Sequence, residues 1–159
     1  MTGTRILMSI KNSGQQILMH GLALVLVGLV WGLMVPHTPH PRLALGAHIQ
    51  FITNGMLFVL MAVLVLKLPH TLGIKSGIVM VAAAYLTWAM ALSEVANAWW
   101  GTNQVLTVTA SQAGVLGGTP WQELLVKLTH IGAGFGLIGA WTLLIAGFVP
   151  RAAVARRED

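Results

Sequence analysis

The stretch from Pro41 to Leu68 constrains the fold most strongly, because it is apolar and long enough to cross a lipid bilayer as one helix. Arg42 and Lys67, near its two ends, are its only charged residues. His48 and Asn54 nevertheless lie inside the run. A polar side chain in hydrocarbon is costly unless a partner satisfies it, so an intramembrane His or Asn is a candidate functional residue.

The composition extends this conclusion to the whole chain. Of its 159 residues, 56% are hydrophobic and only 8% are charged, whereas soluble domains carry about 25% charged residues. We therefore expect one integral membrane domain over residues 1–159. The chain has no cysteine, which excludes disulfides, thiolate chemistry and cysteine-held iron–sulfur clusters. The net charge of +5 does not indicate a nucleic-acid partner, because the basic residues are scattered at the ends of the apolar segments, where they set membrane orientation.

Four apolar segments predict an all-α integral membrane protein, a four-helix transmembrane bundle. The expected spans are 17–35, 43–68, 77–100 and 124–149, with polar tails at 1–15 and 150–159. Most basic residues fall on one side of the membrane: Arg5, Lys11, Lys67, Lys75, Arg151, Arg156 and Arg157. The other side receives Arg42 and Lys127. The positive-inside rule then places both termini in the cytoplasm, as in a multi-pass protein of a bacterial inner membrane.

Two patterns in the last span concern packing. Gly132 and Gly136 form a small-xxx-small face, which lets two helix backbones approach closely. Glu123 and Lys127 are four residues apart, and we expect them to form an ordinary ion pair at the membrane surface.

Polar residues of three different spans are expected to lie at similar depth. With a rise of about 1.5 Å per residue, His48 and Asn54 lie about 8 and 17 Å from the outer end of the second span. The third span runs in the opposite direction, which places Glu94 about 9 Å and Asn97 about 5 Å from the same face. His130 of the fourth span lies at a similar level. These side chains therefore converge in the outer half of the membrane, although His48 and Asn54 point about 120° apart around their helix.

This polar layer suits a small reaction site. A lone intramembrane His can simply bond a carbonyl, but a neutral imidazole is also a good ligand for haem iron, and a single protein ligand leaves the sixth position open. Asn54 and Asn97 are neutral groups that can orient a substrate by hydrogen bonds. Glu94 is a buried carboxyl, which suits a proton donor or shuttle.

Several short segments around this layer carry a family resemblance. They are Pro41–His48 (PRLALGAH) with Asn54-Gly55, His20-Gly21, Ala96-Asn97 with Trp100-Gly101-Thr102, and Gly118–Glu123 (GTPWQE). On these segments the chain resembles the hydroxylaminobenzene mutases over nearly its whole length. The resemblance implies an isomerase that rearranges a small aromatic hydroxylamine to an ortho-aminophenol without net redox change, a step of nitrobenzene degradation and aromatic hydrocarbon catabolism.

His48, followed six residues later by Asn54-Gly55-Met56, also resembles styrene oxide isomerase. That resemblance implies that His48 is the axial ligand of a haem b iron, that Asn54 holds the substrate oxygen, and that the protein is a homotrimer. Asn97 is similar in position to a second pocket asparagine of that family. The catalytic tyrosine of the epoxide isomerase has no counterpart, because the only tyrosine, Tyr85, lies far from the matching end of the third span. Its absence argues against an epoxide substrate.

Three other functions stay open on the sequence. The first is a styrene-oxide-type epoxide isomerase. The second is a non-catalytic b-type haem protein, which needs two axial histidines at matching depth; His48 and His130 meet this condition, whereas His20 lies in the opposite half of the membrane. The third is a small multidrug exporter, but the buried Glu of such exporters lies in the first span, and Glu94 lies in the third.

Overall fold

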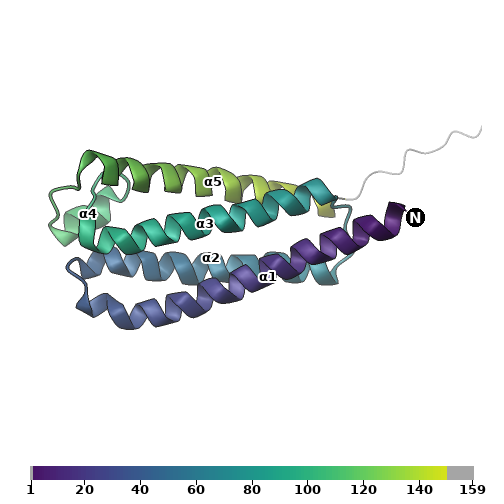
Figure 1. Cartoon of the computed structure of the whole chain (residues 1–159), viewed down its shortest axis with the longest axis horizontal. Coiled ribbons are helices and arrows are strands. Elements are labelled where there is room, and N and C mark those ends of the chain that lie inside the picture. Colours follow the sequence, from purple (N-terminus) through teal and green to yellow (C-terminus); the bar gives the residue numbers. More distant parts are fainter. Residues whose placement is uncertain (1, 150–159) are drawn as a thin grey trace, which may run out of the picture.

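The computed structural model describes residues 2–149, with side chains from Ile10 onward. Its helices are α1 (Thr2–Met34), the short 3-10 turn η1 (Val35–His37), α2 (Pro41–Lys67), α3 (Ile74–Trp100), the short α4 (Thr107–Ala113) and α5 (Pro120–Phe148). Four of them are long and apolar enough to cross a membrane, and no strand occurs in this part of the chain. The predicted all-α, four-span architecture is confirmed (Figure 1).

Helix ends differ from the ends of the apolar segments. α1 begins at Thr2, so the helix of the first span continues back through the residues expected as a polar tail. Lys11 and Asn12 end the apolar run, but their side chains are exposed and need not end the helix. α5 begins at Pro120, where the side chains of Thr119 and Gln122 form a capping box. The expected tail at 150–159 lies outside the described residues.

The segment between α3 and α5 contains a short helix that hydropathy did not predict. α4 packs against α2, and Figure 1 shows it at the end of the bundle where α2 begins. The turns on either side of α4 use Gly101 and Gly114, which both adopt left-handed backbone conformations with φ of 64° and 67°. Glycine adopts this conformation without the penalty of a Cβ atom.

The tightest helix contact, between α1 and α2, depends on glycines that the sequence patterns did not single out. A Cβ atom on Gly21 would lie 2.8 Å from the backbone nitrogen of Val59, and one on Gly55 would lie 2.8 Å from the backbone oxygen of Gly21. The predicted glycine face of α5 is looser. A Cβ atom would lie 3.0 Å from a leucine side chain at Gly136 and 3.8 Å from one at Gly132.

α3 lies at the centre of the arrangement. It packs against α1, α2 and α5, whereas α5 packs mainly against α3. The side chains buried between these helices include Leu24, Phe51, Phe58, Met61, Met80 and Leu144. Many outward-facing apolar side chains are exposed, among them Leu33 at 75% and Phe135 at 74%, as expected for helices surrounded by hydrocarbon. This packing places the polar residues of α3 between those of α2 and α5.

Candidate active site

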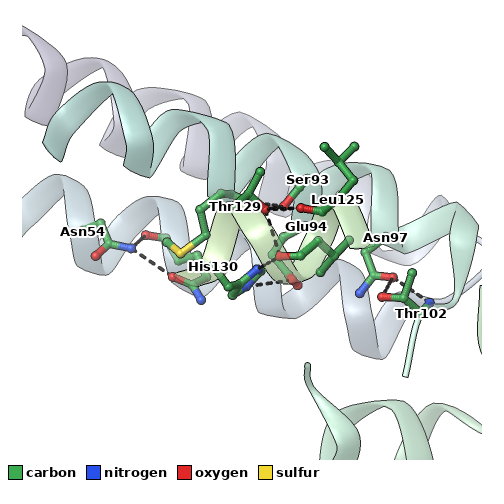
Figure 2. A network of polar contacts seen from close by, with 11 residues as sticks. Asn54, Ser93, Glu94, Asn97, Thr102, Leu125, Thr129 and His130 are labelled. Carbon is green, nitrogen blue, oxygen red and sulfur yellow. Dashed lines mark hydrogen bonds and ion pairs between the residues drawn. The ribbon is translucent and has the colours of Figure 1, made fainter. Parts of the chain in front are cut away.

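A buried carboxyl and an imidazole meet between α3 and α5. Glu94 Oε1 lies 3.0 Å from His130 Nε2, and the Glu94 side chain is fully buried (Figure 2). His130 Nδ1 lies 2.7 Å from the carbonyl oxygen of Val126. Because a carbonyl oxygen can only accept a hydrogen bond, Nδ1 carries a hydrogen, and Nε2 of the neutral ring then has none.

This pair therefore shares a single proton. The Nε2 and Oε1 atoms are not aligned as a linear hydrogen bond, but at 3.0 Å two bare lone pairs would repel each other. The proton lies either on His130, which gives an imidazolium and a carboxylate, or on Glu94, which gives a neutral acid and a neutral ring. In both states the pair is neutral overall, so it places no isolated charge in hydrocarbon.

The second carboxyl oxygen of Glu94 faces α2 at a glycine. Glu94 Oε2 is buried and has no hydrogen-bond partner among the described residues. A Cβ atom on Gly46 would lie 3.5 Å from this oxygen and 3.8 Å from Leu106 Cδ1. Because Gly46 has no side chain, nothing of that residue stands between its backbone and the carboxyl group.

Gly46 also lines a groove between α2 and the loop that carries α4. The groove has a volume of about 340 Å³ and is lined by Gly46, Ile49, Gln50, Thr53, Asn54, Leu106 and Thr109. Small-molecule sites commonly have volumes of about 300–1,000 Å³ and combine apolar walls with a few polar groups. The groove therefore has the size and lining of a site for a small aromatic molecule. Glu94 lies behind Gly46, one of its wall residues.

Asn54 lies on the wall of this groove. Its side chain is 7% exposed, and its Nδ2 donates to the backbone oxygen of Gln50 at 2.9 Å and to Gln50 Oε1 at 3.0 Å. The predicted site residue is thus positioned by a neighbour one helical turn earlier. Figure 2 shows Asn54 on one side of the Glu94–His130 pair and Asn97 on the other, in the depth order expected from the sequence.

The Asn97 side chain forms hydrogen bonds at the C-terminal end of α3. Its Oδ1 accepts hydrogen bonds from the backbone nitrogen of Thr102 at 2.8 Å and from Thr102 Oγ1 at 2.7 Å. Its Nδ2 is buried without a partner among the described residues. One half of this amide therefore fixes the loop after α3, and the other half is left as a free donor.

The expected surface ion pair between Glu123 and Lys127 is wrong. Glu123 is 4% exposed, and its carboxylate accepts from the backbone nitrogens of Asn103 and Gly118, both at 2.9 Å, and of Gln104 at 3.1 Å. The four-residue spacing suggested a helix-surface pair, but the loop folds back onto the first turn of α5 and its amides take the carboxylate. Glu123 thus ties down the loop that forms one wall of the groove.

His48 points away from this groove. Its Nδ1 lies 2.8 Å from the carbonyl oxygen of Gly28 on α1, so Nδ1 must donate. A Cβ atom on Gly32 would lie 2.8 Å from the His48 ring, so the ring occupies the space left by a glycine. The expectation that His48 and Asn54 lie on different faces of α2 agrees with these contacts.

The His48 ring is suited to bind a metal through its other nitrogen. Nε2 has no protein partner among the described residues, and a hydrogen bond from Nδ1 to a carbonyl is the usual way in which a metal-ligating His is oriented. A haem needs only one such ligand. No group of three or more His, Cys, Asp or Glu side chains that could hold a free metal ion occurs in the described part of the chain.

His130 and His20 are both engaged by other residues, so neither offers itself as a second haem ligand beside His48. Both ring nitrogens of His130 already have neighbours, the Val126 carbonyl and Glu94. His20 accepts a hydrogen bond from Trp88 Nε1 at 3.2 Å and packs edge-on against Tyr85, with ring centroids 4.6 Å apart. These contacts argue against the non-catalytic b-type haem protein, which needs two axial histidines.

Sequence reasoning missed three parts of the site. Gln50 and Gly46 were passed over because a glutamine and a glycine in an apolar helix carry no distinctive signal. Leu106 was missed because α4 and its flanking loop were not predicted. Gly46, Gln50 and Asn54 are spaced four residues apart along α2, so they lie on one face of the helix. This spacing from Asn54 could have identified Gln50 and Gly46.

Comparison with known proteins adds a family assignment to this geometry. The family model of styrene oxide isomerase matches residues 13–149. Hydroxylaminobenzene mutase HabA of Ectopseudomonas oleovorans is 30% identical over 131 residues, which cover 81% of this chain and 93% of the relative. Hydroxylaminobenzene mutase HabB of the same organism is 29% identical over 144 residues, covering 91% of this chain and 85% of the relative. No solved structure matches.

Proposed function

Because the chain belongs to the styrene oxide isomerase family, we propose that it is a membrane isomerase that rearranges an aromatic hydroxylamine, hydroxylaminobenzene, to an ortho-aminophenol. Two relatives named as hydroxylaminobenzene mutases support this substrate class. The observation that carries the proposal is the position of Glu94. One of its oxygens lies 3.0 Å from His130 Nε2, and the other is buried 3.5 Å from where a Cβ atom on Gly46, a residue of the groove wall, would lie.

The proposed reaction needs a group that takes up and returns one proton. The N–O bond breaks, a C–O bond forms at the ortho carbon, that carbon loses its hydrogen, and the nitrogen ends as an amine. Atoms and electrons balance within the substrate, so one proton must only move from carbon to nitrogen. A carboxyl and an imidazole that share one proton can carry out this transfer.

The groove is proposed to bind and orient the substrate. Its apolar residues, Ile49 and Leu106, suit the ring, and Asn54 suits the N–OH group. Asn97 is proposed as a second residue that donates a hydrogen bond to the substrate, since its buried Nδ2 has no partner among the described residues. Glu123 would act indirectly, by holding the loop against the groove.

We further propose that His48 binds haem b through Nε2, because Nδ1 is committed to the Gly28 carbonyl. A bound iron would supply Lewis acidity, but His48 points toward α1 and away from the groove, so the steps proposed for the groove do not depend on it. The roles proposed for side chains of this chain are that Asn54 orients the substrate and that Glu94 with His130 moves the proton.

Membranes that contain the protein test the proposal when they are incubated with phenylhydroxylamine and, separately, with styrene oxide. We expect 2-aminophenol from the first substrate, and a haem Soret band in the same sample. Isomerisation of styrene oxide with no 2-aminophenol would instead identify an epoxide isomerase. A haem spectrum without either product would support the alternative of a non-catalytic haem protein.

The cellular setting is also a proposal. The charge distribution supports an inner-membrane protein with both termini in the cytoplasm, and the family resemblance supports a homotrimer. Reporter fusions at each end would be active only when cytoplasmic, and light scattering of the detergent-solubilised protein would give the mass of the oligomer.

A further inference from the structure

Gln50 and Asn54 form an amide pair on one face of α2. Asn54 Nδ2 contacts the backbone oxygen of Gln50 at 2.9 Å and its side-chain oxygen at 3.0 Å. The backbone oxygen fixes the orientation of both amides, because only an NH₂ group can donate to it. The same NH₂ group then requires an oxygen, not a nitrogen, as its second partner on Gln50.

This orientation determines what the pair offers to the groove. Both hydrogens of Asn54 Nδ2 are used, so Asn54 can only accept through Oδ1. Gln50 turns Oε1 toward Asn54, so its free donor is Nε2. Neither free atom has a partner among the described residues, and both residues line the groove. A donor and an acceptor therefore lie side by side on its wall.

We infer that Gln50 is a further substrate-binding residue, which donates to the substrate oxygen while Asn54 accepts from the N–H or O–H of the same group. This inference rests on the proposed function, and it deepens it by naming what the groove selects. A hydroxylamine carries hydrogens and lone pairs on adjacent atoms, so it satisfies both amides. An epoxide offers lone pairs only, which leaves Asn54 Oδ1 unpaired in an apolar setting, at a cost in affinity.

The assignment also changes the role expected for Asn54. The resemblance to styrene oxide isomerase implied that Asn54 holds the substrate oxygen. With its NH₂ group committed to Gln50, Asn54 cannot donate to that oxygen, and the donor is Gln50.

Three probes of similar size test the inference by binding alone: benzyl alcohol, which donates and accepts, anisole, which only accepts, and toluene, which does neither. Dissociation constants are measured by calorimetry on the full chain in lipid nanodiscs. Wild type should bind benzyl alcohol about tenfold more tightly than anisole, and anisole more tightly than toluene, since one hydrogen bond contributes about a factor of ten.

Two substitutions examine Gln50 itself. Gln50→Glu keeps an oxygen for Asn54 but replaces the donor, and Gln50→Met removes the amide at similar length. Gln50→Glu should weaken anisole and benzyl alcohol about tenfold and leave toluene unchanged. Gln50→Met frees one hydrogen of Asn54 Nδ2, so it should weaken the same two probes by less and also leave toluene unchanged. Gln15→Glu, the same exchange at an exposed position near the other end of the α1–α2 pair, should change none of the three.

Equal affinity of wild type for all three probes, or an equal loss for all three in Gln50→Met, would overturn the inference. Binding is read without turnover, so the result is independent of the proposed reaction. If wild type ranks the probes as expected but forms no 2-aminophenol, the amide pair stands and the proposed function fails.

Discussion

Gly46→Ala should separate stability from activity. The added methyl group would lie 3.5 Å from Glu94 Oε2 and 3.8 Å from Leu106 Cδ1, which are ordinary van der Waals distances. The substitution therefore introduces no clash. Because alanine is favoured over glycine inside a helix by about 1 kcal/mol, the variant should be at least as stable as wild type.

The same methyl group would lie between the Gly46 backbone and Glu94 Oε2, where we propose that the proton passes between Glu94 and the substrate. Acid–base catalysis by a positioned group contributes about 10²–10⁴-fold, so we expect the rate of 2-aminophenol formation to fall at least about 100-fold. Gly132→Ala is the matched control. Its Cβ would meet only a leucine side chain, at 3.8 Å, and its activity should equal that of wild type.

The assay quantifies 2-aminophenol by chromatography from equal amounts of each protein in nanodiscs, together with thermal unfolding followed by tryptophan fluorescence. Activity of Gly46→Ala within twofold of wild type, at unchanged stability, would refute the argument that Glu94 acts across Gly46. Loss of both activity and stability would refute the argument that the glycine is dispensable for packing.

Three further changes have distinct expected outcomes. Gly21→Ala should lower the unfolding free energy by about 1–3 kcal/mol, because its Cβ would lie 2.8 Å from the Val59 backbone; an unchanged melting temperature would contradict the α1–α2 packing. Glu123→Ala should leave three backbone N–H groups unpaired and cost about 3 kcal/mol or more, seen as faster limited proteolysis between residues 103 and 118; equal cleavage rates would show that the carboxylate does not hold the loop. His48→Ala should abolish the Soret band of purified protein, whereas His130→Ala should retain it; loss of the band in both variants would favour a haem held by two histidines.

The sequence predicted the features that hydropathy and helix geometry determine. The four spans follow from apolar length, and the similar depth of Glu94 and His130 follows from helix rise in antiparallel helices. Spacing along one helix also separated His48 from Asn54. Each of these predictions depends on one helix at a time, or on depth alone.

Other features depend on how the helices are rotated toward each other and on the path of the loops. Two of the three partners of Glu123, Asn103 and Gln104, lie 20 and 19 residues earlier in the chain, which no local spacing reveals. Glu94 and Leu106 both lie next to Gly46 of α2, and only the rotation of the helices and the path of the loop bring them together there. The role of Gln50 follows from a backbone carbonyl whose position only the folded helix gives.

The central claim is that Glu94 carries the proton in a rearrangement of an aromatic hydroxylamine. The most direct test compares wild type with Glu94→Gln, which keeps the shape of the side chain, in phenylhydroxylamine turnover at equal protein in nanodiscs. The account predicts 2-aminophenol from wild type and a loss of at least about 100-fold in the variant, with unchanged binding of benzyl alcohol. Equal turnover by the two proteins would contradict it.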